Sequence, residues 1–158
     1  MSKDDTKDLL KFYKPFPKEI RETALWLREW VWDQYPHANE LIYDAYNAVA
    51  IGWSLTDKLG HMFCGVGIYR ANNNIHFSFY WGKQLKDPKN ILLGQGSKYR
   101  YILVNDKKTF PRAYIKQLMT TSHALALAKI KDLKEIKEGL TITKAVYDKK
   151  RKPTSRKK

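Results

Sequence analysis

Residues 40–54 read ELIYDAYNAVAIGWS, and this stretch decides the fold. Its apolar, aromatic and β-branched side chains follow a period of two, which predicts strands rather than a helix. Three more segments share this composition: HMFCGVGIY (61–69), NIHFSFYW (74–81) and KYRYILV (98–104). The Asn72–Asn74 run between two of them tolerates positive φ, so we expect a hairpin there. Since no helical crossover separates the strands, we predict a mostly antiparallel, five-stranded sheet.

Helical periodicity flanks this central region on both sides. Residues 6–14 and 16–35 predict a short and a longer helix before the sheet, and a third helix runs from about Thr109 to about Lys131. The order predicts one α+β domain with N-terminal and C-terminal helices packed on the sheet. We divide the chain into a helical extension (1–14), an α+β domain (15–131) and a basic, partly disordered C-terminal extension (132–158).

Composition and charge indicate which class of protein to expect. The 158 residues carry a net charge of +14 and a single cysteine, Cys64, so no intramolecular disulfide forms. The chain has no apolar run long enough for a membrane helix and no export signal at its start, and we expect a soluble, cytoplasmic protein with no membrane partner.

The basic charge is concentrated at the C-terminus. Residues 144–158 hold eight basic residues and one acidic residue, Asp148. Such a tail is either a solvated extension or a site for a polyanion such as nucleic acid. The residues that would make this nucleic-acid contact are Lys149, Lys150, Arg151, Lys152, Arg156, Lys157 and Lys158.

No catalytic set is evident in the sequence. In GQGSKYR (94–100) the glycines precede a strand, whereas a phosphate-binding loop would precede a helix, so we interpret Gly94 and Gly96 as positive-φ turn residues. The four histidines lie in different segments without ligand spacing, and Cys64 lies within a strand. We expect no metal site and no cofactor, and we favour a protein that is not an enzyme.

Two features suggest a binding site for a small ligand, and each also has a structural explanation, namely close helix packing for the small residues and a buried ion pair that fixes the strand register for Asp44. Small residues on two neighbouring strands, among them Gly52, Gly65 and Gly67, leave space that a closely packed helix or a ligand would fill. Asp44 lies in an apolar strand and needs a partner, for which Arg100 is a natural choice. The predicted ligand-binding residues are Asp44, Tyr46, Asn47, His76, Tyr80, Trp81, Lys98 and Arg100.

Two motifs make the chain resemble the YdhG-like family of bacterial domains of unknown function. The first is ELIYDxYNA, met at 40–48, and the second lies within 82–100 and is met by Gly82, Leu85, Asp87, Pro88, Leu92, Leu93, Gly94, Gly96 and Arg100. The resemblance spans roughly residues 15–130 and implies a compact α+β domain, for most members without an assigned activity. A frataxin-like branch, linked to iron handling, is a distant relative. Iron binding would need an acidic surface, whereas residues 1–35 hold seven acidic and seven basic residues.

The sequence therefore predicts a non-catalytic domain that binds a small ligand or a protein partner. The alternative is a nucleic-acid-associated protein that acts through its basic tail. Frataxin-like iron binding is the lesser alternative.

Overall fold

The computed structural model describes residues 6–154. Its helices are α1 (Lys7–Tyr13), α2 (Lys18–Gln34) and α3 (Arg112–Ala128), with short 3-10 helices η1 (Leu59–His61), η2 (Gly82–Gln84) and η3 (Leu133–Glu135). Its strands are β1 (Asn39–Asp44), β2 (Ala48–Ser54), β3 (Met62–Tyr69), β4 (Ile75–Phe79), β5 (Arg100–Val104) and β6 (Thr141–Val146).

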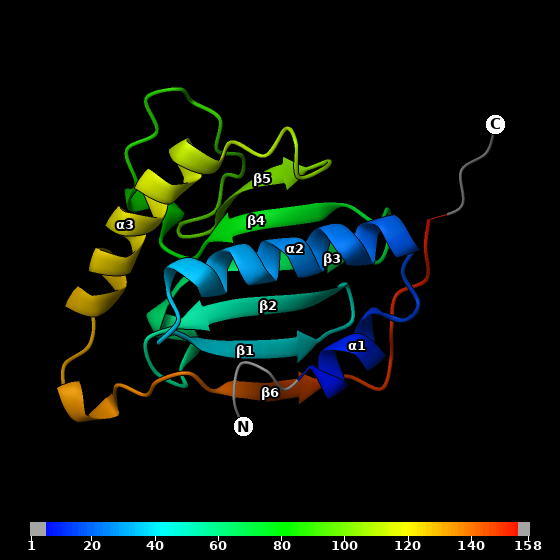
Figure 1. Cartoon of the computed structure of the whole chain (residues 1–158), viewed down its shortest axis with the longest axis horizontal. Coiled ribbons are helices and arrows are strands. Elements are labelled where there is room, and N and C mark those ends of the chain that lie inside the picture. Colours follow the sequence, from blue (N-terminus) through cyan, green and yellow to red (C-terminus); the bar gives the residue numbers. More distant parts are fainter. Residues whose placement is uncertain (1–5, 155–158) are drawn as a thin grey trace.

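The strands form one sheet in the order β5-β4-β3-β2-β1-β6 (Figure 1). Strands β1 to β5 pair antiparallel along the chain, and β6 pairs parallel to β1. The α+β class is confirmed. The prediction of five antiparallel strands is wrong, because TITKAV (141–146) adds a sixth strand. As an edge strand, β6 pairs with the sheet along one side only, so its sequence needs few apolar residues. The many lysines around it in the sequence obscure the strand pattern.

Local chemistry explains the predicted hairpin between β3 and β4. Asn73 adopts a φ of 60°, and its N–H donates to the Tyr69 carbonyl at 2.9 Å. The Asn72 side chain accepts from the Asn74 N–H at 2.9 Å, an Asx-type turn. The asparagine run therefore makes the turn that its conformational tolerance predicts.

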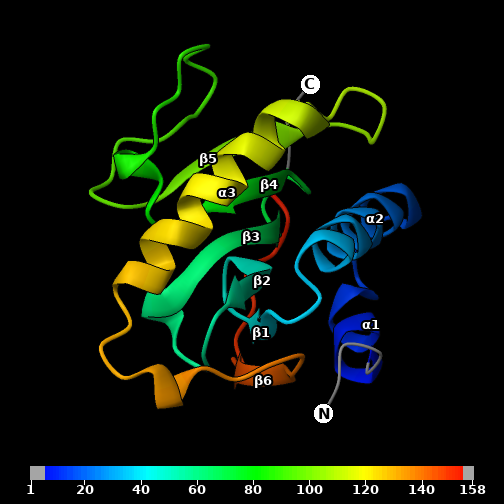
Figure 2. The same ribbon diagram turned by 60° about the vertical axis from the view of Figure 1, so that its left-hand side comes forward.

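The helices α2 and α3 cover one face of the sheet, and α1 lies on the same side beside β6 (Figures 1 and 2). Trp30 of α2 packs edge-on against Phe77 of β4 at 6.0 Å between ring centroids, and Trp32 against Trp53 of β2 at 6.4 Å. Aromatic residues thus wedge α2 onto the sheet and supply much of the core.

No helix covers the opposite face within residues 6–154, and we call it the open face. The space expected above the glycines of β2 and β3 is filled by other side chains. A Cβ at Gly52 would lie 1.9 Å from Met62 Sδ, and one at Gly67 would lie 3.5 Å from the Tyr69 ring. The expectation that a helix packs closely on these glycines is wrong for the described residues, because Met62 and Tyr69 of β3 lie over Gly52 and Gly67 instead.

A buried ion pair joins three elements on the helical side. Arg28 of α2 donates to both Glu40 carboxylate oxygens, at 2.5 and 2.9 Å, and both residues are at most 5% exposed. The Thr141 hydroxyl of β6 donates to the same carboxylate at 3.0 Å. This triad fixes α2 and the parallel edge strand against β1.

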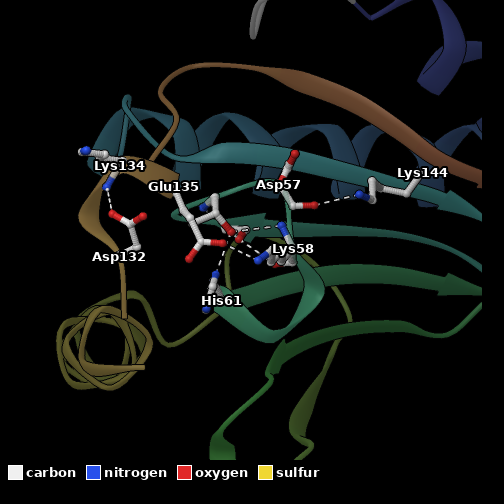
Figure 3. A network of polar contacts seen from close by, with 9 residues as sticks. Asp57, Lys58, His61, Asp132, Lys134, Glu135 and Lys144 are labelled. Carbon is white, nitrogen blue, oxygen red and sulfur yellow. Dashed lines mark hydrogen bonds and ion pairs between the residues drawn. The ribbon is translucent and has the colours of Figure 1, made fainter. Parts of the chain in front are cut away.

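Polar contacts also hold the segment before β6 against the β2–β3 connection (Figure 3). Lys58 pairs with Glu135 of η3, and Lys144 of β6 donates to the Asp57 carbonyl at 2.8 Å. The segment that the sequence set apart as an extension thus contributes a strand and surface contacts to the sheet.

Candidate functional site

The eight predicted ligand residues do not form one site. Asp44, Tyr46 and Asn47 lie where β1 ends, and His76 lies within β4. Tyr80, Trp81, Lys98 and Arg100 lie at the other end of β4, where β5 begins. Because each strand from β1 to β4 runs opposite to its neighbour, the end of β1 and the end of β4 lie at opposite ends of the sheet.

Asp44 is paired, but the predicted partner is wrong. Its carboxylate binds Arg70, at the end of β3, and the Lys150 ammonium at 2.9 Å. Arg100 lies on β5, four strands from β1, or about 19 Å at the usual strand spacing. The sequence gives no strand order, so it could not show that Arg70 is the nearer guanidinium.

Further hydrogen bonds at the end of β1 join it to Arg70 and to the C-terminal segment. The Arg70 guanidinium also donates to the Ala45 carbonyl at 3.1 Å, and the Arg151 N–H donates to the Tyr46 carbonyl at 2.9 Å. Lys150 adds a hydrogen bond to the Asp44 carbonyl at 3.0 Å. This cluster fastens the C-terminal segment to the sheet.

The residues of the predicted basic tail therefore differ in their contacts. Lys150 and Arg151 hold the segment in place, and Lys149 and Lys152 are exposed. Arg156, Lys157 and Lys158 lie outside the described residues.

His76 is the centre of an aromatic row on the open face. Its ring stacks on Tyr101 of β5 at 4.0 Å between centroids and lies tilted by 32° against the ring of Tyr69 of β3 at 4.2 Å. A hydrogen bond of 3.3 Å joins its Nδ1 to the Tyr99 hydroxyl. Burial lowers the pKa of His76 to about 4, so the ring is neutral at pH 7.

The other four predicted residues do come together. We call Tyr80, Trp81, Lys98, Arg100 and the additional Lys129 the tryptophan corner. The Lys129 ammonium lies 3.9 Å from the Trp81 ring centroid, and the Lys98 ammonium lies 5.0 Å from it and 5.4 Å from that of Tyr80. These are cation–π distances.

Backbone contacts hold the corner in shape. The Trp81 indole N–H donates to the Gly60 carbonyl at 3.2 Å, and the Lys83 N–H donates to the Lys98 carbonyl at 3.1 Å. Arg100 donates to the Gly96 and Tyr99 carbonyls at 2.5 and 2.7 Å, so its guanidinium fixes the turn that carries Lys98.

Within residues 6–154, Lys98, Arg100 and Lys129 form no ion pair with a carboxylate. The loop and strand start at 82–100 hold five basic residues and one acidic residue, Asp87. That carboxylate accepts from the Tyr114 hydroxyl and, at 2.8 Å, from the Leu92 N–H. The corner is therefore a cationic surface with partly exposed aromatic rings.

Sequence reasoning missed Lys129. It follows α3, more than forty residues after Trp81 in the chain, and only the packing of α3 brings it to the corner. A lysine at the end of a helix is an ordinary terminal residue, so no pattern in the sequence marks it.

The glycine turn before β5 differs from its prediction in one residue. Gly94 has a φ of 110°, whereas Gly96 is not among the positive-φ residues of the described chain. Leu93 exchanges two backbone hydrogen bonds with Tyr101, at 2.7 and 3.1 Å, and Gly94 makes this return possible. The loop serves as a turn that places Lys98 and Arg100.

A separate cavity of about 180 Å³ lies between the end of α2, α3 and residues 136–138. Tyr35 and His123 stack at its wall with centroids 5.0 Å apart. It contains none of the eight predicted ligand residues.

Some site classes find no support in the described part of the chain. Residues 6–154 contain no group of three or more His, Cys, Asp or Glu side chains that could hold a metal ion. Burial raises the pKa of the Cys64 thiol well above its usual value, which makes it a poor nucleophile. None of the helices in this part is both long and apolar enough to cross a membrane.

The comparisons with known proteins add no relative. The sequence matches no family model, no curated protein and no solved structure.

Proposed function

We propose that the protein is a non-catalytic binding domain whose ligand, an anion with a planar ring, binds at the tryptophan corner. One observation carries the proposal. Two lysine ammonium groups, Lys98 and Lys129, lie on the Trp81 ring without a carboxylate partner in the described chain.

The chemistry of the corner fits such a ligand. The indole and the Tyr80 ring offer faces for a flat group, and the lysines offer charge for its anionic part. Lysine side chains are long and flexible, so they can leave the ring face and bind the anion as a ring stacks in their place. The indole itself stays in position because its N–H is bonded to the Gly60 carbonyl.

Membership of the YdhG-like family stays a prediction, and the geometry supplies a physical reason for one of its motifs. A Cβ at Gly82 would lie 2.5 Å from the Arg100 Cβ and 2.9 Å from its backbone nitrogen. The first and last residues of the second motif are therefore in contact, and only glycine fits this approach. The motif thus shapes the loop that carries Lys98.

Calorimetric titration tests the proposal. We expect a nucleoside monophosphate to bind and ringless pyrophosphate to bind more weakly. Lys98→Ala and Lys129→Ala should each weaken nucleotide binding by about three- to tenfold, the range for loss of one charge–ring or charge–anion contact.

The control is Lys116→Ala, which removes the same charge from an exposed position of α3 about 20 Å along the helix from Lys129. Equal losses for the control and the corner variants would show an effect of net charge alone. That result, or equal binding of pyrophosphate and nucleotide, would refute the proposed site.

A further inference from the structure

We infer that the ligand of the tryptophan corner is a single-stranded nucleic acid that continues from the corner onto the open face of the sheet. This inference rests on the proposed function and extends it from one ring to several.

The open face carries aromatic rings on three adjacent strands. Phe77 of β4 points to the helices, where it meets Trp30, so the alternating His76 points to the open face. Tyr101 of β5 stacks on it at 4.0 Å, and the tilted ring of Tyr69 of β3 lies 4.2 Å from it. Tyr99 adds a fourth ring, 5.6 Å from Tyr101.

The aromatic row on the open face lies next to the tryptophan corner along the chain. His76, Ser78 and Tyr80 alternate along β4 and its continuation, and Trp81 follows at once. From His76 to Phe79 the strand covers three steps, or about 10 Å at strand geometry, and Tyr80 and Trp81 follow in a turn. A surface of this length exceeds one nucleotide and suits a short oligonucleotide, whose bases stack on aromatic side chains in turn.

The positive charge around the corner favours a polyanion as the ligand. The corner has three basic side chains without a carboxylate partner, and the loop beside the open face is strongly basic. The stacked His76 ring is neutral at pH 7 and adds no charge. The rings and the charges therefore come from different residues, so base stacking and phosphate binding can be varied separately.

Single strands fit this surface better than duplexes. In a duplex the base faces are stacked inside, and only edges and phosphates reach a protein surface. Aromatic rings next to lysines without a carboxylate partner suit a single-stranded nucleic acid, because its bases are exposed for stacking.

The experiment measures fluorescence anisotropy with oligonucleotides of about twelve nucleotides, oligo(dT) and oligo(rU), between about 50 and 200 mM salt. We expect tighter binding than for the mononucleotide, and weaker binding of a duplex and of polyglutamate. Lys98→Ala and Lys129→Ala should each lower the slope of log affinity against log salt by about one.

The aromatic variants should act differently. Tyr101→Ile should weaken binding by roughly five- to hundredfold, the range for loss of one stacked base, with an unchanged salt slope. Trp81→Phe keeps a ring and should keep most of the affinity, whereas Trp81→Leu should not. Tyr46→Ala, at the far end of the sheet and 39% exposed, is the matched control and should bind as the parent does.

A chain truncated after residue 154 and carrying Lys149→Ala and Lys152→Ala lacks five of the seven basic tail residues and keeps Lys150 and Arg151, which hold the C-terminal segment in place. We expect it to retain binding that depends on Tyr101 and Lys98. Complete loss of binding would assign the nucleic acid to the tail and overturn the inference. Equal affinity for polyglutamate would overturn it too, since no ring would then be needed.

The inference and the proposed function fail in different ways. If the mononucleotide binds at the corner and the oligonucleotide binds no tighter, the inference is wrong and the proposed function stands. If neither binds, both are wrong. Urea midpoints equal to that of the parent ensure that each loss reflects binding and not unfolding.

Discussion

The buried pair of Arg28 and Glu40 gives the sharpest test of the fold. In Glu40→Gln the side chain keeps its shape and an acceptor for Thr141, but the negative charge is lost. Arg28, 5% exposed, then keeps its charge in the interior without the carboxylate that it binds at 2.5 and 2.9 Å.

Breaking a buried ion pair from one side costs about 3–5 kcal/mol. We expect about 3 kcal/mol, the lower end, because the glutamine oxygen still accepts one hydrogen bond from the guanidinium. For a domain of this size each kcal/mol lowers the melting temperature by about 2–4 °C, so the expected shift is about 6–12 °C. Urea denaturation followed by circular dichroism measures the free energy of unfolding directly.

A double variant separates the charge from the packing. Arg28→Met with Glu40→Met removes both charges and keeps two long side chains, and we expect it to be more stable than Glu40→Gln. A loss below about 1 kcal/mol in Glu40→Gln, typical of a surface pair, would refute the reasoning, as would a double variant less stable than the single one.

Three further outcomes are expected. Gly94→Ala should cost about 1–2 kcal/mol of unfolding free energy because its φ is 110°, whereas Gly96→Ala, with open space around it, should cost well under 1; equal losses in urea melts would contradict this. The folded-state pKa of His76, about 4, lies below the unfolded value of about 6.5, so its contribution to stability is complete above pH 6.5 and is lost as the pH falls towards 4. His76→Phe should therefore be less acid-sensitive in urea melts at pH 7 and pH 4.5, whereas exposed His37→Gln should behave as the parent does. Lys150→Ala removes one of two cations from the carboxylate at the end of β1, so chymotrypsin should cut the segment after β6 faster than in the parent; an unchanged rate would show that the ion pair does not hold this segment.

The split of the predicted ligand set shows where sequence reasoning stops. Asp44 was correctly expected to need a cation, because a carboxylate in an apolar strand must be paired. The choice between Arg70 and Arg100 depends on strand order, which the periodicity of single strands does not contain. Likewise, Lys98 and Trp81 were selected one by one, and nothing in the sequence marked Lys129 as their neighbour.

Strands β1 to β5, the asparagine hairpin and the α+β class were determined by the sequence itself, because period and turn chemistry act between residues close in the chain. The parallel edge strand β6, the triad of Arg28, Glu40 and Thr141, and the tryptophan corner were decided only by tertiary structure. Each joins segments distant in sequence through burial and charge pairing, and these interactions depend on which surfaces meet once the sheet has formed.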